Sequence, residues 1–140
     1  MKYDVMLSLK GIQHYEEQEQ ETIELITEGT LEQTQEGWSL SYDESELTGL
    51  AGVRTTFQVK PGCVTLNREG KLSSTMVFEE GVIHESLYRM EFGALLLTVC
   101  ANKVRYDLSE KGGTIDLSYA IEIEQSAAGF IDYHLTVTTK

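Results

Sequence analysis

Apolar and polar residues alternate with a period of two along almost the whole chain of 140 residues. The strictest case is the segment 115–123, in which large apolar residues are separated by small or polar ones, and segments 5–10 and 131–137 repeat the pattern. Such alternation is typical of strands that bury one face. It predicts about ten strands, at residues 3–12, 20–33, 38–44, 52–60, 63–68, 71–78, 82–91, 94–106, 114–124 and 130–138.

The connections between these strands are short. Glycines and the single proline, Pro61, stand where the alternation breaks, and short connections indicate antiparallel neighbours. Consecutive antiparallel strands in this number strain an open sheet, whereas closure into a barrel removes the exposed edges. The sequence therefore predicts an all-β fold, a closed antiparallel meander barrel of about 8–10 strands, in a single domain that spans residues 1–140.

Loop lengths predict which side chains share the inner face. For the hairpin around residues 79–81, a two-residue turn would place Glu85 opposite Met76, on the apolar face. A three-residue loop with Gly81 in the left-handed conformation instead pairs Met76 with His84 and Phe78 with Val82. The second register agrees with the two preceding hairpins, so we expect His84 to point inward.

The predicted inner face mixes polar and apolar side chains. A polar group buried without a partner costs roughly 1–3 kcal/mol, so such groups bond one another, hold water, or line a cavity that receives a ligand. A barrel of about eight or more strands is wide enough for the last of these. The candidate residues for binding a small apolar or amphipathic molecule in the lumen are Tyr42, Thr55, Phe57, Met76, Phe78, His84, Ser86 and Tyr88.

The alternative interpretation is a filled barrel without a ligand, which serves as a protein–protein interaction or structural module. In that case the same residues are ordinary core residues, and His84 is a hydrogen-bonded core histidine. The sequence leaves the choice open.

Charge and composition narrow the classes of partner. The formal net charge of −12 argues against nucleic acid and against an anionic membrane surface, both of which require clusters of Lys and Arg. The chain shows no signal peptide, and its longest apolar run is far shorter than the roughly 20 residues of a spanning helix. Cys63 and Cys100 belong to no CxxC pair. We therefore expect a cytoplasmic protein with free thiols.

Motifs of catalysis are missing from the sequence. There is no GxSxG, no HExxH, no GxGxxG and no P-loop, and the three histidines lie far apart in the chain. The sequence consequently predicts a protein that is not an enzyme and that has no metal site and no cofactor.

The outer face carries a predicted apolar patch. The same hairpin register leaves Val77, Ile83, Leu87 and Leu96 outside, and a contiguous patch of aliphatic residues usually marks an interface. We expect a homodimer that uses these four residues, since two-fold dimers are the commonest oligomers. The alternative is that the loop at 44–52 covers the patch within one chain.

Several short motifs occur in a characteristic order. They are Leu40-Ser41-Tyr42 with Glu44, Arg68-x-Gly70, Phe78-x-x-Gly81, Tyr88-x-Met90-x-Phe92-Gly93 with Leu95 and Leu97, and Ile115-x-Leu117-x-Tyr119. This ordered series resembles the YwiB-like family of small bacterial proteins, from about residue 38 onward and more weakly in the first two strands. The resemblance implies a lipocalin-like (calycin) β-barrel. It implies no activity and no site residues, because the function of that family is unknown.

Overall fold

A computed structural model gives the fold over residues 2–14, 21–44, 52–90, 93–124 and 126–140, and these are the residues described below. Ten strands account for most of them, close to the predicted positions. The strands are β1 (Lys2–His14), β2 (Glu21–Gln33), β3 (Trp38–Asp43), β4 (Val53–Lys60), β5 (Cys63–Gly70), β6 (Ser74–Glu79), β7 (Ile83–Met90), β8 (Gly93–Ser109), β9 (Gly112–Ile123) and β10 (Ser126–Thr139). No described segment forms a helix long and apolar enough to cross a membrane. Most of the loop predicted at 44–52 lies outside the described residues.

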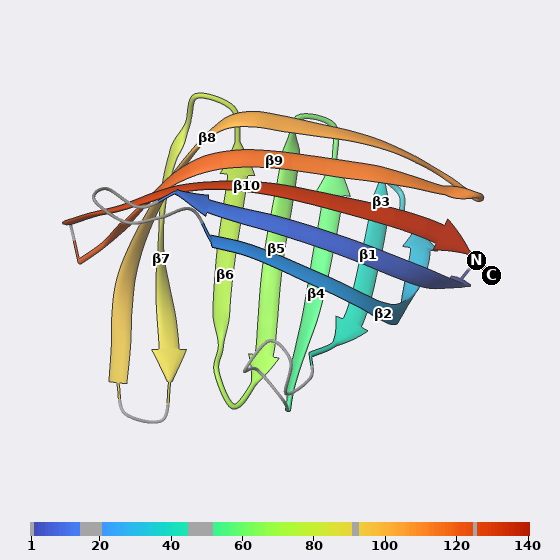
Figure 1. The fold of residues 1–140 in the computed structure, drawn as a ribbon, viewed down its shortest axis with the longest axis horizontal. Helices are drawn as coiled ribbons and strands as arrows, with labels where there is room; N and C mark the ends of the chain where they lie inside the picture. The colour runs from blue at the N-terminus through green and yellow to red at the C-terminus, as the bar shows by residue number, and fades with distance from the viewer. Residues whose placement is uncertain (1, 15–20, 45–51, 91–92, 125) are drawn as a thin grey trace.

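All ten strands belong to one antiparallel sheet in the order β6-β5-β4-β3-β2-β1-β10-β9-β8-β7. Strands that are consecutive in the sequence pair with each other, except β6 and β7, and the first strand pairs with the last. The pairing of β1 with β10 brings the two ends of the chain side by side (Figure 1). The predicted all-β meander barrel is thus confirmed, although the barrel is nearly rather than fully closed.

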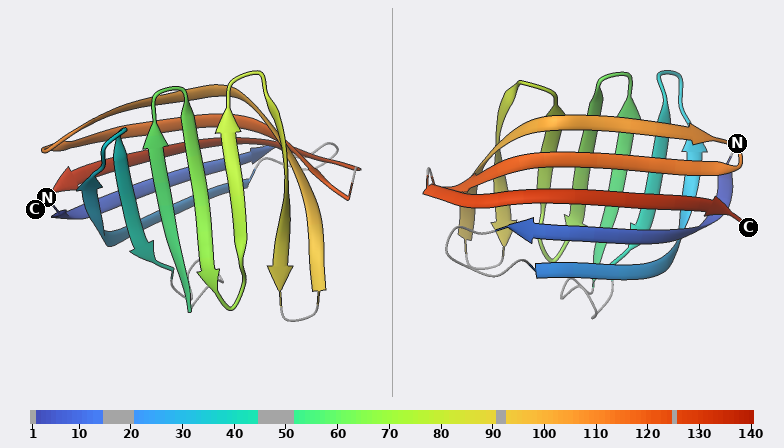
Figure 2. Two further views of the ribbon diagram at one scale, coloured as in Figure 1. Left: turned by 180° about the vertical axis from the view of Figure 1, so that it is seen from behind. Right: turned by 45° about the horizontal axis from the view of Figure 1, so that its top comes forward.

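The sheet folds over into two layers that face each other. Strands β3 to β7 run side by side in the first layer, while β9, β10, β1 and the start of β2 run across them in the second layer (Figures 1 and 2). Strand β8 belongs to both layers, because it pairs with β7 over its first half and continues along β9 beyond it. A β-bulge between Ala101 and Lys103 accompanies this bend, as bulges do where strands change direction.

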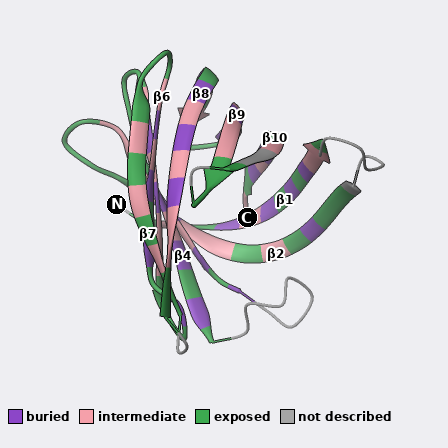
Figure 3. Ribbon diagram, turned by 90° about the vertical axis from the view of Figure 1, so that its left-hand side faces the viewer, coloured by how far each residue is buried: buried purple, intermediate pink, exposed green. Residues whose placement is uncertain are grey.

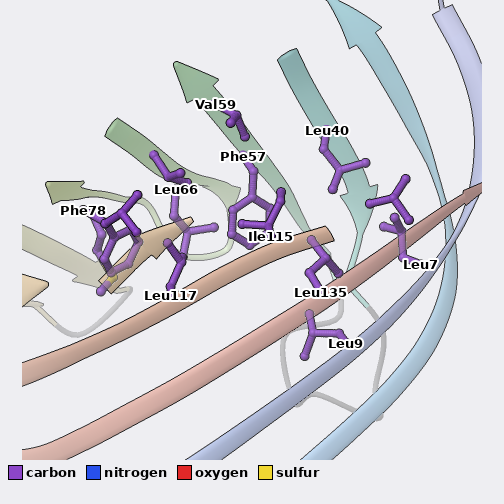
Figure 4. Packing of buried hydrophobic residues seen from close by; sticks show 14 of the residues in the cluster. Leu7, Leu9, Leu40, Phe57, Val59, Leu66, Phe78, Ile115, Leu117 and Leu135 are labelled. Atoms are coloured by element: carbon purple, nitrogen blue, oxygen red, sulfur yellow. The ribbon is translucent and has the colours of Figure 1, made fainter. Parts of the chain in front are cut away.

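The hydrophobic core lies between the layers. Alternate residues of each strand point inward, so buried and exposed positions alternate along β1 and β4 (Figure 3). Phe57 and Leu66 from the first layer meet Ile115 and Leu117 from the second within one buried cluster (Figure 4). Full burial of each such side chain contributes roughly 1.5–3 kcal/mol. Trp38 is partly buried and packs against this cluster.

The predicted ladder between β6 and β7 does not form, so the pairings of Met76 with His84 and of Phe78 with Val82 are wrong. Within residues 73–90, all of which are described, a single antiparallel bridge joins Ser73, the residue before β6, to Arg89 of β7. A seam therefore separates the remaining lengths of β6 and β7, which do not pair with each other. Hydrogen bonds between the turn after β6 and β8 join the two edges of the sheet instead.

Backbone and side-chain hydrogen bonds at the other end of β6 explain the seam. The turn after β6 bonds to β8 instead of directing β7 back along β6: the Gly81 amide donates to the Ala101 carbonyl at 2.9 Å. The Glu80 carboxylate accepts from the Val104 amide at 2.9 Å and pairs with Arg105. From Ile83 to Tyr88 the predicted faces hold, since Ile83, Glu85 and Leu87 are exposed while His84, Ser86 and Tyr88 are partly buried. Val82, predicted on the inner face opposite Phe78, is instead 40% exposed.

The ends of β8 and β9 approach each other closely at Gly113. Its φ is +145°, and a Cβ atom built on it would lie 1.7 Å from the Asp107 carbonyl oxygen. Gly62 also has a positive φ, +75°, but no atom lies within 4 Å of its Cβ position. We expect Gly113→Ala to lower the free energy of unfolding by about 3 kcal/mol or more, against about 1 kcal/mol for Gly62→Ala. Urea denaturation of both variants checks this, and equal losses would contradict the close approach.

Candidate functional site

The two layers do not fill the space between them. A cavity of about 420 Å³ lies inside the barrel, and all ten strands contribute to its lining. Its walls are mostly apolar: Leu9, Ile23, Phe57, Leu66, Met76, Phe78, Leu95, Leu97, Leu117, Ile121, Ile123 and Ile131. Ile23 and Ile123 are 42% and 38% exposed although they line the cavity, so the cavity opens to solvent beside them.

Gly11 leaves part of this space empty. It stands on β1 between Ile23 of β2 and Tyr133 of β10, and all three residues line the cavity. A Cβ atom at Gly11 would make an ordinary contact of 3.7 Å with the Tyr133 ring. The backbone at this position therefore tolerates a side chain, and a larger one would enter the lumen.

A chain of hydrogen bonds lies at one part of the cavity wall. The Tyr133 hydroxyl donates to the Tyr42 oxygen, and the Tyr42 hydroxyl donates to the Glu44 carboxylate. Thr55 Oγ1 donates to Glu44 Oε1 at 2.7 Å. Glu44 is only 8% exposed and Thr55 is fully buried, so both donors stabilise a carboxylate that has little contact with water.

The two tyrosines of this chain remain neutral. Burial raises the pKa of Tyr42 and of Tyr133 above the ordinary value of 10.0, and the negative charge of Glu44 raises that of Tyr42 further. Both hydroxyls consequently act as hydrogen-bond donors throughout the physiological pH range.

Arg68 adds a positive charge to the same wall. It lies on β5 between Thr55 of β4 and Ser74 of β6, and it lines the cavity. Its side-chain Nε is buried and has no hydrogen-bond partner among the described residues. A buried donor of a charged group that lacks an acceptor lowers the stability of the fold. Among the atoms of this wall, Arg68 Nε would therefore gain most from a hydrogen-bond acceptor.

The cavity brings together five of the eight candidate lumen residues. Tyr42, Phe57, Met76, Phe78 and Tyr88 line it, as expected of residues on the inner face. Thr55, His84 and Ser86 do not line it, which corrects the prediction that all eight face the lumen. Thr55 is fully buried but does not line the cavity, and its hydroxyl donates to Glu44.

His84 and Ser86 lie at the seam instead. His84 Nε2 bonds to Glu79 Oε1 at 2.9 Å, because the open hairpin leaves the end of β6 within reach of the ring. Ser86 Oγ and Ser74 Oγ, from the two sides of the seam, are both buried without a partner among the described residues. Both serines line a groove of about 490 Å³ between β6, β7 and β8.

The other two histidines lie on the outer face. His14 Nε2 bonds to Asp132 at 3.2 Å, and His134 bonds to Asp116. In the described ranges no group of three or more His, Cys, Asp or Glu side chains is placed to hold a metal ion.

Sequence reasoning missed Glu44, Arg68 and Tyr133 as parts of the site. Arg68 is the last residue of the predicted strand 63–68, and although it continues the alternation of Val64 and Leu66 on the inner face, a charged residue beside a turn does not indicate an inward position. Glu44 has no such signal, because its burial depends on the Thr55 hydroxyl of the neighbouring strand.

These features define a class: an antiparallel meander β-barrel with an internal, mostly apolar cavity and one polar wall. The chain belongs to the family described as "Domain of unknown function (DUF1934)", whose pattern matches residues 7–137. It is similar to "Uncharacterized beta-barrel protein YwiB" of Bacillus subtilis (strain 168), with 32% identity over 104 residues that cover 74% of this chain and 72% of that protein.

The same fold occurs in a solved structure. The crystal structure of the ywiB protein from Bacillus subtilis superposes with a TM-score of 0.88 at 26% identity, and the match covers 99% of this chain and 93% of that one. The resemblance to the YwiB-like family and the antiparallel β-barrel are thereby confirmed, while the lipocalin-like (calycin) assignment stays a prediction.

The raised pKa values of Tyr42 and Tyr133 predict sensitivity to alkali. Above pH 10 the unfolded chain loses these two protons while the folded chain keeps them, so the folded state binds more protons and stability falls as the pH rises. We expect Tyr42→Phe to flatten this fall measurably, whereas Tyr106→Phe on β8 leaves it unchanged. Melting temperatures between pH 7 and 11 check the prediction, and identical profiles for both variants would contradict it.

Proposed function

We propose that this protein binds a small amphipathic molecule inside the barrel. The observation that carries the proposal is the cavity itself: about 420 Å³ of space with apolar walls and a polar wall formed by Tyr42, Glu44, Arg68 and Tyr133. Small-molecule sites have this character, with a concave apolar surface and a few placed polar groups. A filled structural barrel has no need of such a space, and an empty cavity lowers stability.

The volume of the cavity limits the size of the ligand. Dividing 420 Å³ by the roughly 30 Å³ that a water-sized group occupies in a liquid gives about 14 non-hydrogen atoms. The ligand is therefore a compact molecule or a medium-length chain. The opening beside Ile23 and Ile123 gives it a path from solvent.

The proposal is of a binding protein and not of an enzyme. Its polar wall consists of two neutral tyrosines, a hydrogen-bonded carboxylate and an arginine, all of which can position a ligand.

Binding in the lumen is tested with ten-carbon amphiphiles, which approach the size limit. Saturation with decanol or decanoate is expected to raise the melting temperature by roughly 5–10 °C at a concentration about 100 times Kd. Gly11→Leu fills the lumen and should abolish the shift, because its side chain projects between Ile23 and Tyr133.

Lys10→Leu is the matched control for Gly11→Leu. It places the same side chain at the preceding residue of β1, which is exposed, and it should leave binding intact. If no amphiphile shifts the melting temperature of the unmodified protein, the proposed function is wrong.

The outer groove favours a second function, self-association. This groove of about 490 Å³ is lined by Val77, Leu87 and Leu96, three of the four residues predicted for the dimer interface. The fourth, Ile83, is 66% exposed. Apolar side chains gathered at an open groove favour a protein contact.

Charge in the groove suits a second copy of this chain. Glu85 and Arg89 line it with opposite charges on the same face of β7. In a two-fold dimer the same patch meets itself, so Glu85 of each copy can pair with the partner's Arg89. An unrelated partner would have to bring both charges in the reverse order.

Sedimentation at micromolar concentration tests this dimer. We expect a dimer that Leu87→Glu converts to a monomer, since the new charge would be buried in the interface. Ile26→Glu is the matched control: Ile26 is 72% exposed on β2, away from the groove, and the variant should remain dimeric. A monomeric unmodified protein, or a dimer that tolerates Leu87→Glu, would rule out the proposal.

A further inference from the structure

We infer that the ligand in the lumen carries an anionic head group and that Arg68 binds it. This inference rests on the proposed function and adds the chemical class of the ligand. It begins from the hydrogen bonds of the polar wall. The Tyr133 hydroxyl is used on Tyr42, and the Tyr42 hydroxyl is used on Glu44. Thr55 also donates to Glu44.

Arg68 is the donor of this wall that remains available. Its Nε–H is buried and has no partner among the described residues, although a guanidinium can donate five hydrogen bonds. Neighbouring strands hold Arg68 in place, because it pairs with Thr55 on one side and Ser74 on the other. Arg68 lines the cavity, so an anion in the lumen meets its side chain, and a shift of the guanidinium toward that anion would give the shielded Nε–H the acceptor that it lacks.

The charges of the wall favour an anion over a neutral acceptor. The guanidinium of an arginine carries a positive charge, and hydrogen bonds in which a partner is charged are roughly twice as strong as neutral ones. Tyr42 and Tyr133 remain neutral and do not repel an anion, so within this wall the charge of Glu44 alone opposes one, and that carboxylate is stabilised by hydrogen bonds from Thr55 and Tyr42. The cavity's reduced polarity strengthens the attraction further, relative to the same pair in water.

The same wall disfavours a cationic head group. Glu44 is the acidic residue that lines the cavity, and its carboxylate already accepts hydrogen bonds from Thr55 and Tyr42. An ammonium group would have to share an acceptor that already holds two hydrogen bonds, and it would meet the positive charge of Arg68. Selectivity for the sign of the charge follows because Arg68 has a donor without a partner, whereas Glu44 already accepts two hydrogen bonds.

Size and charge together specify the ligand class. It is a monoanion, such as a carboxylate, on an apolar body that brings the total to about 14 non-hydrogen atoms. The head group contacts Arg68, and the body contacts the leucine and isoleucine side chains of β8 and β9 that line the cavity.

Three ligands with the same ten-carbon chain test the inference: decanoate, decanol and decylammonium. Isothermal titration at neutral pH and about 0.15 M salt compares their affinities for the unmodified protein. We expect decanoate to bind at least tenfold more tightly than decanol, and decylammonium to bind most weakly of the three.

Two variants locate the effect at Arg68. Arg68→Gln removes the charge while keeping a shorter polar side chain, and it should reduce decanoate affinity about tenfold or more while changing decanol affinity by less than about threefold. Arg68→Lys keeps the charge without the Nε donor and should retain part of the preference. Circular dichroism and melting temperature establish that each variant is folded.

The outcomes separate the inference from the proposed function. If decanol and decanoate bind the unmodified protein equally, the anionic head group is wrong and lumen binding stands. If none of the three ligands binds, both are wrong. A preference for decanoate that survives in a folded Arg68→Gln variant would place the anion elsewhere and overturn the role of Arg68.

Discussion

The rest of this structure depends on the alternation of side chains in a sheet that closes on itself. Each strand sends every second residue inward, so ten strands supply the interior with side chains from two facing layers. Large residues such as Phe57 and Ile115 meet and exclude water where the layers pack closely. Where the inward position is Gly11, or where isoleucines reach the open edge, the side chains do not meet and the cavity remains.

The polar wall is a consequence of the same closure. Alternation places Tyr42, Arg68 and Tyr133 on the inner face together with the apolar core, so their polar atoms must find partners inside. The Glu44 carboxylate accepts hydrogen bonds from the hydroxyls of Tyr42 and Thr55, and the Tyr133 hydroxyl donates to Tyr42. Arg68 Nε is left over. A protein that only needed a stable core would gain from an apolar residue there, so the retained arginine suits a site that receives a ligand.

The sequence predicted the faces of the strands well and the joining of β6 to β7 poorly. A period of two assigns Tyr88 inward and Leu87 outward whatever strand lies beside them, and both assignments hold. Strand pairing depends on contacts distant in sequence. Glu80 bonds to Val104 on β8, which separates the two strands and leaves His84 with Glu79 instead of the lumen. Arg68 was missed because a charged residue close to a glycine is typical of a loop and not of an inner face.

Binding inside the barrel requires a lumen that apolar molecules can enter. Crystals held under xenon pressure show whether they can, because xenon enters apolar cavities and is located by its electron density. We expect a xenon atom among Phe78, Leu97 and Leu117, which line the cavity, and we expect it to be absent from Gly11→Leu crystals. Side chains in contact across the lumen, with no xenon between the two layers, would show that the lumen is filled.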